Sequence, residues 1–278
     1  MIRIHRLLYM VPHDYHLHTT YSCDAKATMA EMCQAAVTGG FKEIGFTEHY
    51  DLNPVDECYD WFKAEAWYTE IEQCRSLFKS RLMIRAGIEF SEPHCYPQGV
   101  QSLLDRLPFD YVIGSLHYVG TELVFSQEYF RRRTADQAFQ ECYTEMERMT
   151  ATGNFDILGH LDVLALTAKL YYGSYDPCRY EDAIRAVLRN CIQRGIVLEV
   201  NSQGLRKPAQ MLVPGVEILR WYAELGGESI CLGSDAHVAS HLGMHLDVAL
   251  QTARDSGIKT LTCFEKRQKQ QVPLTVFT

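Results

Sequence analysis

The chain has 278 residues and a formal net charge of −8, with 47% hydrophobic and 22% charged residues. This composition is typical of a globular protein, and the acidic balance disfavours nucleic-acid binding, which usually needs a basic face. No segment approaches the roughly 18 uninterrupted apolar residues of a membrane helix, and the apolar run in residues 1–12 is too short for a secretory signal. We therefore expect a cytoplasmic protein that folds as one domain over residues 1–278, since α/β barrels of this length often form a single unit.

The ten cysteines are scattered singly along the chain and form no C-x-x-C pair. Their spacing indicates neither a zinc knuckle nor a disulfide framework. We expect them to be mostly small buried hydrophobic residues without a functional role.

Seven short apolar runs alternate with longer helix-like stretches. In chain order, the runs are DYHLHT (14–19), EIGFTEH (43–49), LMIRAGIEF (82–90), YVIGSLH (111–117), DILGHLD (156–162), IVLEVNS (196–202) and ICLGSDAH (230–237). They are continuous and do not alternate with polar residues, which is typical of strands covered on both faces. Repeated strand–helix–strand units predict an α/β fold with a parallel sheet.

Three of the intervening stretches carry helix signals. Thr28 and Glu31 have the spacing of a capping box, and the helix they begin should end at two glycines, 39 and 40. Apolar residues fall on one face of residues 182–195, and residues 215–227 repeat that pattern before the last run. The basic stretch FEKRQKQQ (264–271) is expected to be a solvated face or tail.

Polar side chains with metal-binding chemistry stand at the carboxyl ends of these runs. They are His16, His18, Glu48, His49, Glu89, His117, His160, Asp162, Asp235 and His237, with Asn201 ending the remaining run. In a parallel barrel, all strand carboxyl ends point to one face, where sites are built. Imidazole and carboxylate are ligands that zinc, iron and manganese share. The other histidines are expected to be structural: His5, His13, His94, His241 and His245.

The spacing within two of the runs indicates more than one ion. In His16-Leu17-His18, the strand period of two sends both imidazoles to one face, and Asp235 and His237 repeat this arrangement. Two such pairs and the single ligands exceed what one ion can use. Glu89 is the natural bridging carboxylate, because an unpaired carboxylate among its apolar neighbours would be costly.

Two further stretches leave alternatives open. Arg206 and Lys207 follow the sixth run, where a guanidinium would suit a phosphate group but could equally bridge a surface loop. The aromatic-rich residues 50–73 could cover a pocket, or pack their rings in the core.

Taken in order, the motifs DYHLHTTYSCD, GFTEHYD, GIEFSEPH, YVIGSLHYV, DILGHLD, EVNSQGLRK and LGSDAH resemble the polymerase and histidinol phosphatase (PHP) superfamily, and most closely its histidinol-phosphatase branch. The resemblance spans about residues 14–237 and implies a distorted seven-stranded (β/α)7 barrel. It also implies a centre of three divalent ions, zinc, manganese or iron.

Carried over by motif, the first ion would be held by His16, His18, Glu89 and Asp235, the second by Glu89, His117 and His160, and the third by Asp24, His49 and His237. Many members have histidine where Asp24 stands, but the histidinol-phosphatase branch commonly has aspartate. Arg206 matches a phosphate contact of the family, and Lys169 is the nearest cation for a second one.

The resemblance implies a phosphomonoesterase that converts L-histidinol phosphate to L-histidinol and phosphate, a late step of histidine biosynthesis. Metal ions would lower the pKa of a water and bind phosphoryl oxygens. Asp162, Asp24 or a metal-bound water would protonate the leaving group, and the oligomeric state is left open. The alternatives are a PHP-type phosphoesterase for another small metabolite or nucleotide, and a regulatory module that binds metal without catalysis. An amidohydrolase is disfavoured because it usually has eight strands and often a bridging lysine.

Overall fold

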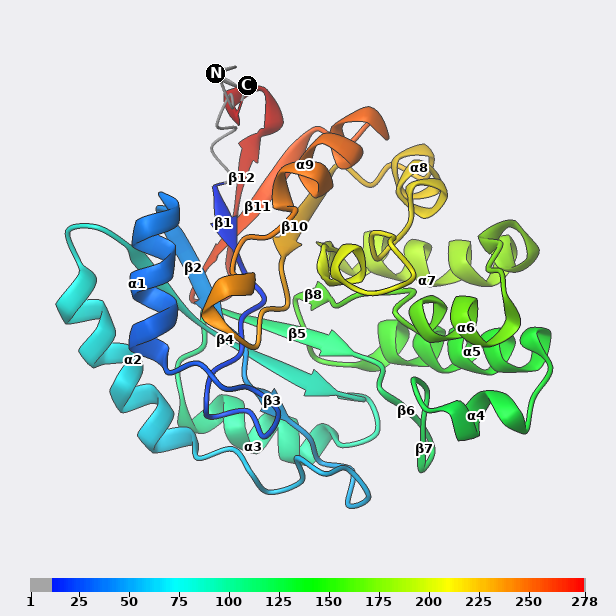
Figure 1. Ribbon diagram of the computed structural model, residues 1–278, viewed down its shortest axis with the longest axis horizontal. Coiled ribbons are helices and arrows are strands. Elements are labelled where there is room, and N and C mark those ends of the chain that lie inside the picture. The colour runs from blue at the N-terminus through cyan, green and yellow to red at the C-terminus, as the bar shows by residue number, and fades with distance from the viewer. Residues whose placement is uncertain (1–11, 278) are drawn as a thin grey trace, which may run out of the picture.

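The computed structural model describes residues 12–277, which form an α/β fold around one large sheet (Figure 1). The strand order is β1-β2-β4-β5-β8-β9-β10-β11-β12, with β3 paired to β4, and neighbours are parallel except for β11 and β12. A separate two-stranded ribbon pairs β6 with β7. The strands are β1 (His13–Asp14), β2 (Glu43–Phe46), β3 (His49–Tyr50), β4 (Met83–Ser91), β5 (Tyr111–Ser115), β6 (Tyr118–Val119), β7 (Glu122–Leu123), β8 (Ile157–Leu158), β9 (Val197–Asn201), β10 (Ser229–Gly233), β11 (Thr260–Glu265) and β12 (Gln268–Pro273).

The helices lie around the outside of the sheet and cover its outer face (Figure 1). They are α1 (Met29–Gly39), α2 (Ala64–Phe78), α3 (Pro97–Arg106), α4 (Gln127–Arg131), α5 (Ala135–Thr152), α6 (Leu164–Tyr172), α7 (Glu181–Arg194), α8 (Val216–Glu224) and α9 (Leu246–Asp255). Four short 3-10 turns are η1 (Pro177–Tyr180), η2 (Gln203–Arg206), η3 (Ala239–His241) and η4 (Leu274–Phe277). Among the described residues, no helix has the length and apolar character needed to span a membrane.

Each of the seven predicted runs overlaps a strand: β1, β2, β4, β5, β8, β9 and β10. The first run is the weakest match, because it shares only Asp14 with β1 and continues with an isolated bridge at Leu17. Every residue of β5, β9 and β10 is buried, as the continuous apolar pattern predicted. Beyond β1, the chain also bonds to the β10 segment. The Tyr15 N–H donates to the Leu232 carbonyl at 2.9 Å, and the His18 N–H donates to the Ala236 carbonyl at 3.0 Å. The start of the chain therefore lies between β2 and the β10 segment.

The three predicted helices are confirmed. Thr28 caps α1 in a full capping box with Glu31, and Gly40 ends the helix in the left-handed conformation, which glycine adopts without steric cost. The other two helices are α7 and α8, which bury the apolar faces that the pattern indicated.

Two expectations hold only in part. The FEKRQKQQ stretch is a solvated face, since all of its residues except Phe264 and Arg267 are exposed. It is not a tail, because it belongs to the β11–β12 hairpin, in which Phe264 is buried and Arg267 pairs with Asp156. Most cysteines are buried as expected, but Cys23 and Cys58 form a disulfide, with their Cα atoms 5.4 Å apart. Both features depend on which segments meet in three dimensions, and a separation of 35 residues between two lone cysteines carries no such information. His5 and the N-terminal apolar run lie outside the described residues.

Candidate metal centre and pocket

The predicted strand-end residues gather around Glu89, in the middle of the sheet. Glu89 lies on β4, in register with His49 of β3 on one side and Ile113 of β5 on the other. Its side chain is fully buried. The parallel register therefore brings ligands from several strands to one carboxylate, as expected for strand carboxyl ends.

Five imidazoles surround the two oxygens of Glu89. Oε2 lies 3.3 Å from His16 Nε2, 3.5 Å from His18 Nε2 and 3.0 Å from His49 Nδ1. Oε1 lies 3.6 Å from His117 Nε2 and 3.0 Å from His160 Nε2. This division gives each oxygen its own set of histidines, which is the arrangement a bridging carboxylate requires.

The side-by-side placement of His16 and His18 follows from the strand period. Leu17 between them is fully buried in the core and forms a parallel bridge with Ala236. On the opposite face, His16 Nε2 and His18 Nε2 lie 3.9 Å and 3.5 Å from Asp235 Oδ1. The predicted same-face geometry of the two imidazoles is confirmed.

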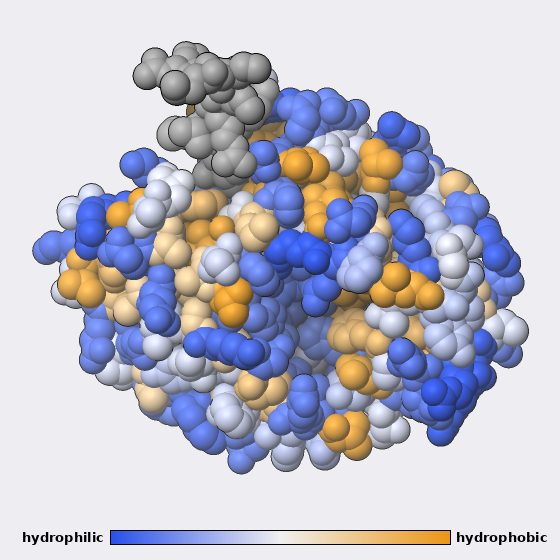
Figure 2. All heavy atoms as spheres, viewed as in Figure 1, coloured by the Kyte–Doolittle hydropathy of each residue, from blue (hydrophilic) through white to orange (hydrophobic). Residues whose placement is uncertain are grey.

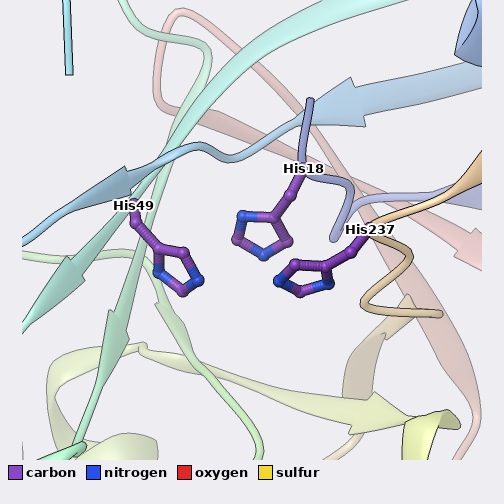
Figure 3. A group of neighbouring side chains, drawn as sticks. All are labelled: His18, His49 and His237. Carbon is purple, nitrogen blue, oxygen red and sulfur yellow. The ribbon is translucent and has the colours of Figure 1, made fainter. Parts of the chain in front are cut away.

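A second group of side chains extends toward solvent. Figure 3 shows that the rings of His18, His49 and His237 converge, with His18 between the other two. Asp24, which is partly exposed, lies 3.0 Å from His237 Nε2 and 3.8 Å from His49 Nε2. Burial opposes ionisation of Asp24, but the bond to His237 and the proximity of His49 outweigh it and hold the Asp24 pKa below its usual range. Asp24 is therefore an anion beside these two rings.

Hydroxyl groups behind the cluster fix the tautomers of two histidines. The Ser22 hydroxyl donates to Glu48 at 2.7 Å, so its oxygen accepts from His18 Nδ1 at 3.1 Å. The Ser91 hydroxyl donates in the same way to Asp51 and accepts from His117 Nδ1 at 2.7 Å. In both rings Nδ1 carries the proton, which leaves the Nε2 lone pair directed at the centre.

Glu199, on β9, does the same for His16. Its Oε1 lies 2.6 Å from His16 Nδ1, and its Oε2 accepts the backbone N–H of His160 at 2.7 Å. Gly233 makes room for this contact, since a Cβ there would lie 2.6 Å from the His16 Cβ. Gly233 of β10 and Glu199 of β9 thus set the orientation of His16, two residues after β1.

The electrostatics of the cluster favour a cation at its centre. Burial lowers the pKa of His18 to about 3 and that of His117 to about 3, so both rings are neutral and can donate a lone pair. Burial also disfavours a charge on His16, but Glu199, Glu89 and Asp235 overcome it and raise the His16 pKa well above its ordinary value. Carboxylates that hold a proton this strongly would also attract a metal ion.

Unpartnered atoms point to the same conclusion. His16 Nε2, His18 Nε2, His49 Nδ1 and Glu89 Oε2 are buried and have no hydrogen-bond partner. A buried polar atom without a partner costs about 1–3 kcal/mol, so four together call for an occupant. Their imidazole and carboxylate chemistry fits divalent zinc, iron or manganese. Several triads of side chains here offer ligand atoms within 4.8 Å of one another, including His16, His160 and Asp235.

The cluster lies at the base of a cavity of about 900 Å³. Figure 2 shows a hollow in the middle of the molecule with hydrophilic residues on its walls and apolar residues along part of its rim. Besides the cluster, four segments contribute to the lining: Val55, Asp56, Glu57 and Cys58; Val163, Leu166, Thr167 and Leu170; Gln203, Arg206, Lys207 and Pro208; and Asp235, His237, Val238 and His241. His241, expected to be structural, is one of them. Of the aromatic-rich stretch, Asp51 and residues 55–58 line the cavity, but none of its aromatic residues does. Phe62 and Trp67 pack in the core instead, as the second alternative predicted.

Arg206 lines this cavity, but Lys169 and Asp162 do not. One Arg206 nitrogen, Nη2, donates to the Ser234 carbonyl at 2.7 Å, while Nη1 is buried without a partner. Lys169 is exposed on α6, donates to the Ala209 carbonyl at 2.8 Å and is absent from the lining, where Lys207 stands instead. Asp162 is fully buried behind the cavity, accepts the Gly215 N–H at 3.3 Å, and has its pKa raised to about 7 by burial.

Comparison with known proteins is consistent with this geometry. The family model for the PHP domain matches residues 14–203, which contain Glu89 and its five histidines. The chain belongs to the PHP-domain family. Its place within the histidinol-phosphatase branch of that family, which the motifs indicated, is supported by its relatives.

Among PHP-domain relatives, a probable histidinol-phosphatase of Deinococcus radiodurans is 32% identical over 92% of this chain and 98% of its own length. The histidinol-phosphatase of Lactococcus lactis is 25% identical over 90% of this chain and 93% of its own length. The crystal structure of the Lactococcus lactis enzyme, in complex with zinc, L-histidinol and phosphate, superimposes with a TM-score of 0.85 and covers 93% of this chain and 98% of that one.

Some residues that shape this PHP-domain site escaped the sequence reasoning. Glu199 is a single polar residue within an apolar run, so the pattern there indicates only a strand. Ser22 and Ser91 belong to a residue type common on any surface, so their presence alone does not indicate a site. Asp51 stands in the quoted motif GFTEHYD, two residues after His49, and could have been found from that spacing. Its Oδ2 lies 3.9 Å from His49 Nδ1, and its Oδ1 lies 4.0 Å from His117 Nδ1.

Proposed function

We propose that this protein hydrolyses L-histidinol phosphate to L-histidinol and inorganic phosphate, using three divalent metal ions. The observation that carries the proposal is the buried Glu89, with histidine nitrogens around both of its oxygens and unpartnered atoms facing inward. The extent of the similarity to histidinol-phosphatases supports the substrate. A different small phosphate ester remains the alternative substrate for the same site.

The distances between side chains support the ligand sets carried over from the motifs. Each proposed set is made of side chains that lie close together: His16, His18, Glu89 and Asp235 for the first ion, Glu89, His117 and His160 for the second, and Asp24, His49 and His237 for the third. These ligands suit zinc, manganese and iron alike.

We also infer that β1, β2, β4, β5, β8, β9 and β10 form a distorted seven-stranded barrel. The bonds from Tyr15 to Leu232 and from His18 to Ala236 support closure, because they join the first strand to the last of the seven. The single domain over residues 1–278 and the cytoplasmic location stay predictions.

When bound, divalent ions supply Lewis acidity toward phosphoryl oxygens and lower the pKa of a water. The chain's own side chains bind the phosphoryl group and orient the histidines. Arg206 Nη1, a buried donor without a partner, is placed to bind a phosphoryl oxygen. Glu199, Ser22 and Ser91 hold His16, His18 and His117 with their Nε2 lone pairs toward the centre. Of the two carboxylates considered as proton donors, Asp24 lines the cavity as an anion, whereas Asp162, whose pKa burial raises to about 7, is fully buried and outside the lining.

The test is phosphate release from L-histidinol phosphate, nucleoside monophosphates, sugar phosphates and a phosphodiester, before and after chelation. We expect metal-dependent turnover with a kcat/KM for histidinol phosphate well above that for every other compound. Metal-dependent turnover that favours another compound would support the alternative substrate. Inactivity of metal-loaded protein toward the whole panel would instead support a non-catalytic metal-binding module.

A further inference from the structure

The cavity above the metal centre has unpaired charges of both signs, contributed by different segments. Arg206 and Lys207 come from η2 and the residue after it, and Asp56 and Glu57 come from the loop before α2. None of these four forms an ion pair with another residue within 12–277. Elsewhere, exposed charges are often paired, as in Lys259 with Glu228.

Asp56 is held in place by bonds that leave its charge available. Its Oδ1 accepts the Cys58 N–H at 2.6 Å, its side chain is hydrogen-bonded to that of Tyr118, and its own N–H donates to the Asn53 carbonyl at 3.0 Å. Neutral donors of this kind orient a carboxylate without cancelling its charge.

The loop that carries Asp56 and Glu57 is tied to the rest of the wall on two sides. The disulfide joins Cys58 to Cys23, next to Asp24, and the Asn53 side chain donates to the Gly120 carbonyl at 3.0 Å. A carboxylate on a loop fixed in this way loses little conformational freedom when it binds a ligand, which increases affinity.

A ligand that satisfies both sets of charges has an anionic end and a cationic end. Arg206 lies beside Asp235, and so at the metal centre, because its Nη2 is 3.2 Å from the Asp235 carbonyl. The anionic end therefore belongs there, which leaves the cationic end for Asp56 and Glu57. A cavity of about 900 Å³ has room for more than a phosphate group.

We propose that Asp56 and Glu57 bind the ammonium group of the substrate and make the enzyme selective for phosphate esters that carry an amine on the carbon next to the ester carbon. This inference rests on the proposed function, in which the substrate is such an amine. Charge-assisted N–H···O bonds to a carboxylate are about twice as strong as neutral ones, so the two residues act as specificity determinants and take no part in breaking the ester bond.

The test compares two substrates that differ only in the amine: L-histidinol phosphate and its deamino analogue, 3-(imidazol-4-yl)propyl phosphate. The variants are Asp56→Asn, Glu57→Gln and their combination. Asparagine keeps the Oδ1 acceptor that the Cys58 N–H needs, so Asp56→Asn removes charge and little else. Asp60→Asn is the matched control, because it removes a charge from the same loop at an exposed residue outside the cavity lining.

We expect the double variant to raise KM for histidinol phosphate by about 10- to 100-fold, the effect of losing a hydrogen bond to a charged group, with little change in kcat. The deamino analogue should bind the double variant as well as it binds the unaltered protein, or better, because two negative charges near a phosphate ester are gone. Asp60→Asn should leave KM and kcat unchanged for both substrates.

An equal loss for both substrates, or no loss for either, would overturn the inference and leave the proposed function standing. Failure of the unaltered, metal-loaded protein to hydrolyse either ester would overturn the proposed function and the inference with it.

Discussion

Replacing Glu199 by glutamine tests how the cluster is held ready for metal. Glu199 uses both oxygens, one for His16 Nδ1 at 2.6 Å and one for the His160 N–H at 2.7 Å. Glutamine has a single acceptor oxygen, so one of the two N–H groups loses its partner whichever way the amide turns. If the amide nitrogen faces His16, the ring proton moves to Nε2 and blocks the lone pair that points at Glu89.

A lost buried hydrogen bond costs about 1–3 kcal/mol, and loss of the partner behind a metal-ligating histidine typically weakens metal binding about 10- to 100-fold. We expect Glu199→Gln to lower the apparent affinity for zinc or manganese by this factor, with activity largely recovered at saturating metal. The assay is phosphate release against buffered free metal, together with competition against a chromophoric chelator.

The matched control is Glu228→Gln, which removes a carboxylate from an exposed ion pair with Lys259. Glu228 precedes β10, whereas Asp235 follows it at the other end, and Glu228 is not in the cavity lining. Its metal dependence should equal that of the unaltered protein. If Glu199→Gln shows the same metal dependence as this control, His16 is not a ligand oriented by Glu199 and the argument fails.

Two further predictions concern stability. Changing both Cys23 and Cys58 to serine should lower the free energy of unfolding by up to about 4 kcal/mol, the chain-entropy value for a cross-link spanning 35 residues. In urea denaturation, the unaltered protein treated with dithiothreitol should have the same stability as the variant. If dithiothreitol does not change the stability of the unaltered protein, this prediction is refuted. Burial lowers the pKa of His13 to about 3, so the unfolded chain binds a proton below pH 6.5 that the folded chain does not. His13 should therefore cost about 2 kcal/mol of stability between pH 7 and pH 5. Urea unfolding of metal-free His13→Gln should show a correspondingly flatter pH dependence, and an unchanged dependence would contradict the reasoning.

Much of the centre could be predicted because its residues follow from two local rules. Parallel strands end on one face, so His117 and His160 could be expected near Glu89 from their positions in their runs. The strand period of two placed His16 and His18 together. Neither rule needs knowledge of the helices.

The features that were missed depend on contacts between segments far apart in the chain. Glu199 functions through a ring 183 residues away, and within its own run it is a single polar residue among apolar ones. The Cys23–Cys58 disulfide and the β11–β12 hairpin likewise require knowledge of which loops and edges meet. The position of Lys169 after the GHLD motif predicts a second phosphate contact, but on α6 its ammonium group donates to the Ala209 carbonyl instead.

The most direct test of the central claim is to strip the protein of metal and measure phosphate release from L-histidinol phosphate as zinc or manganese is returned in known equivalents. The account predicts that the stripped protein is inactive and that activity rises until three ions are bound per chain. Full activity of the stripped protein, or saturation of activity with a single bound ion, would contradict it.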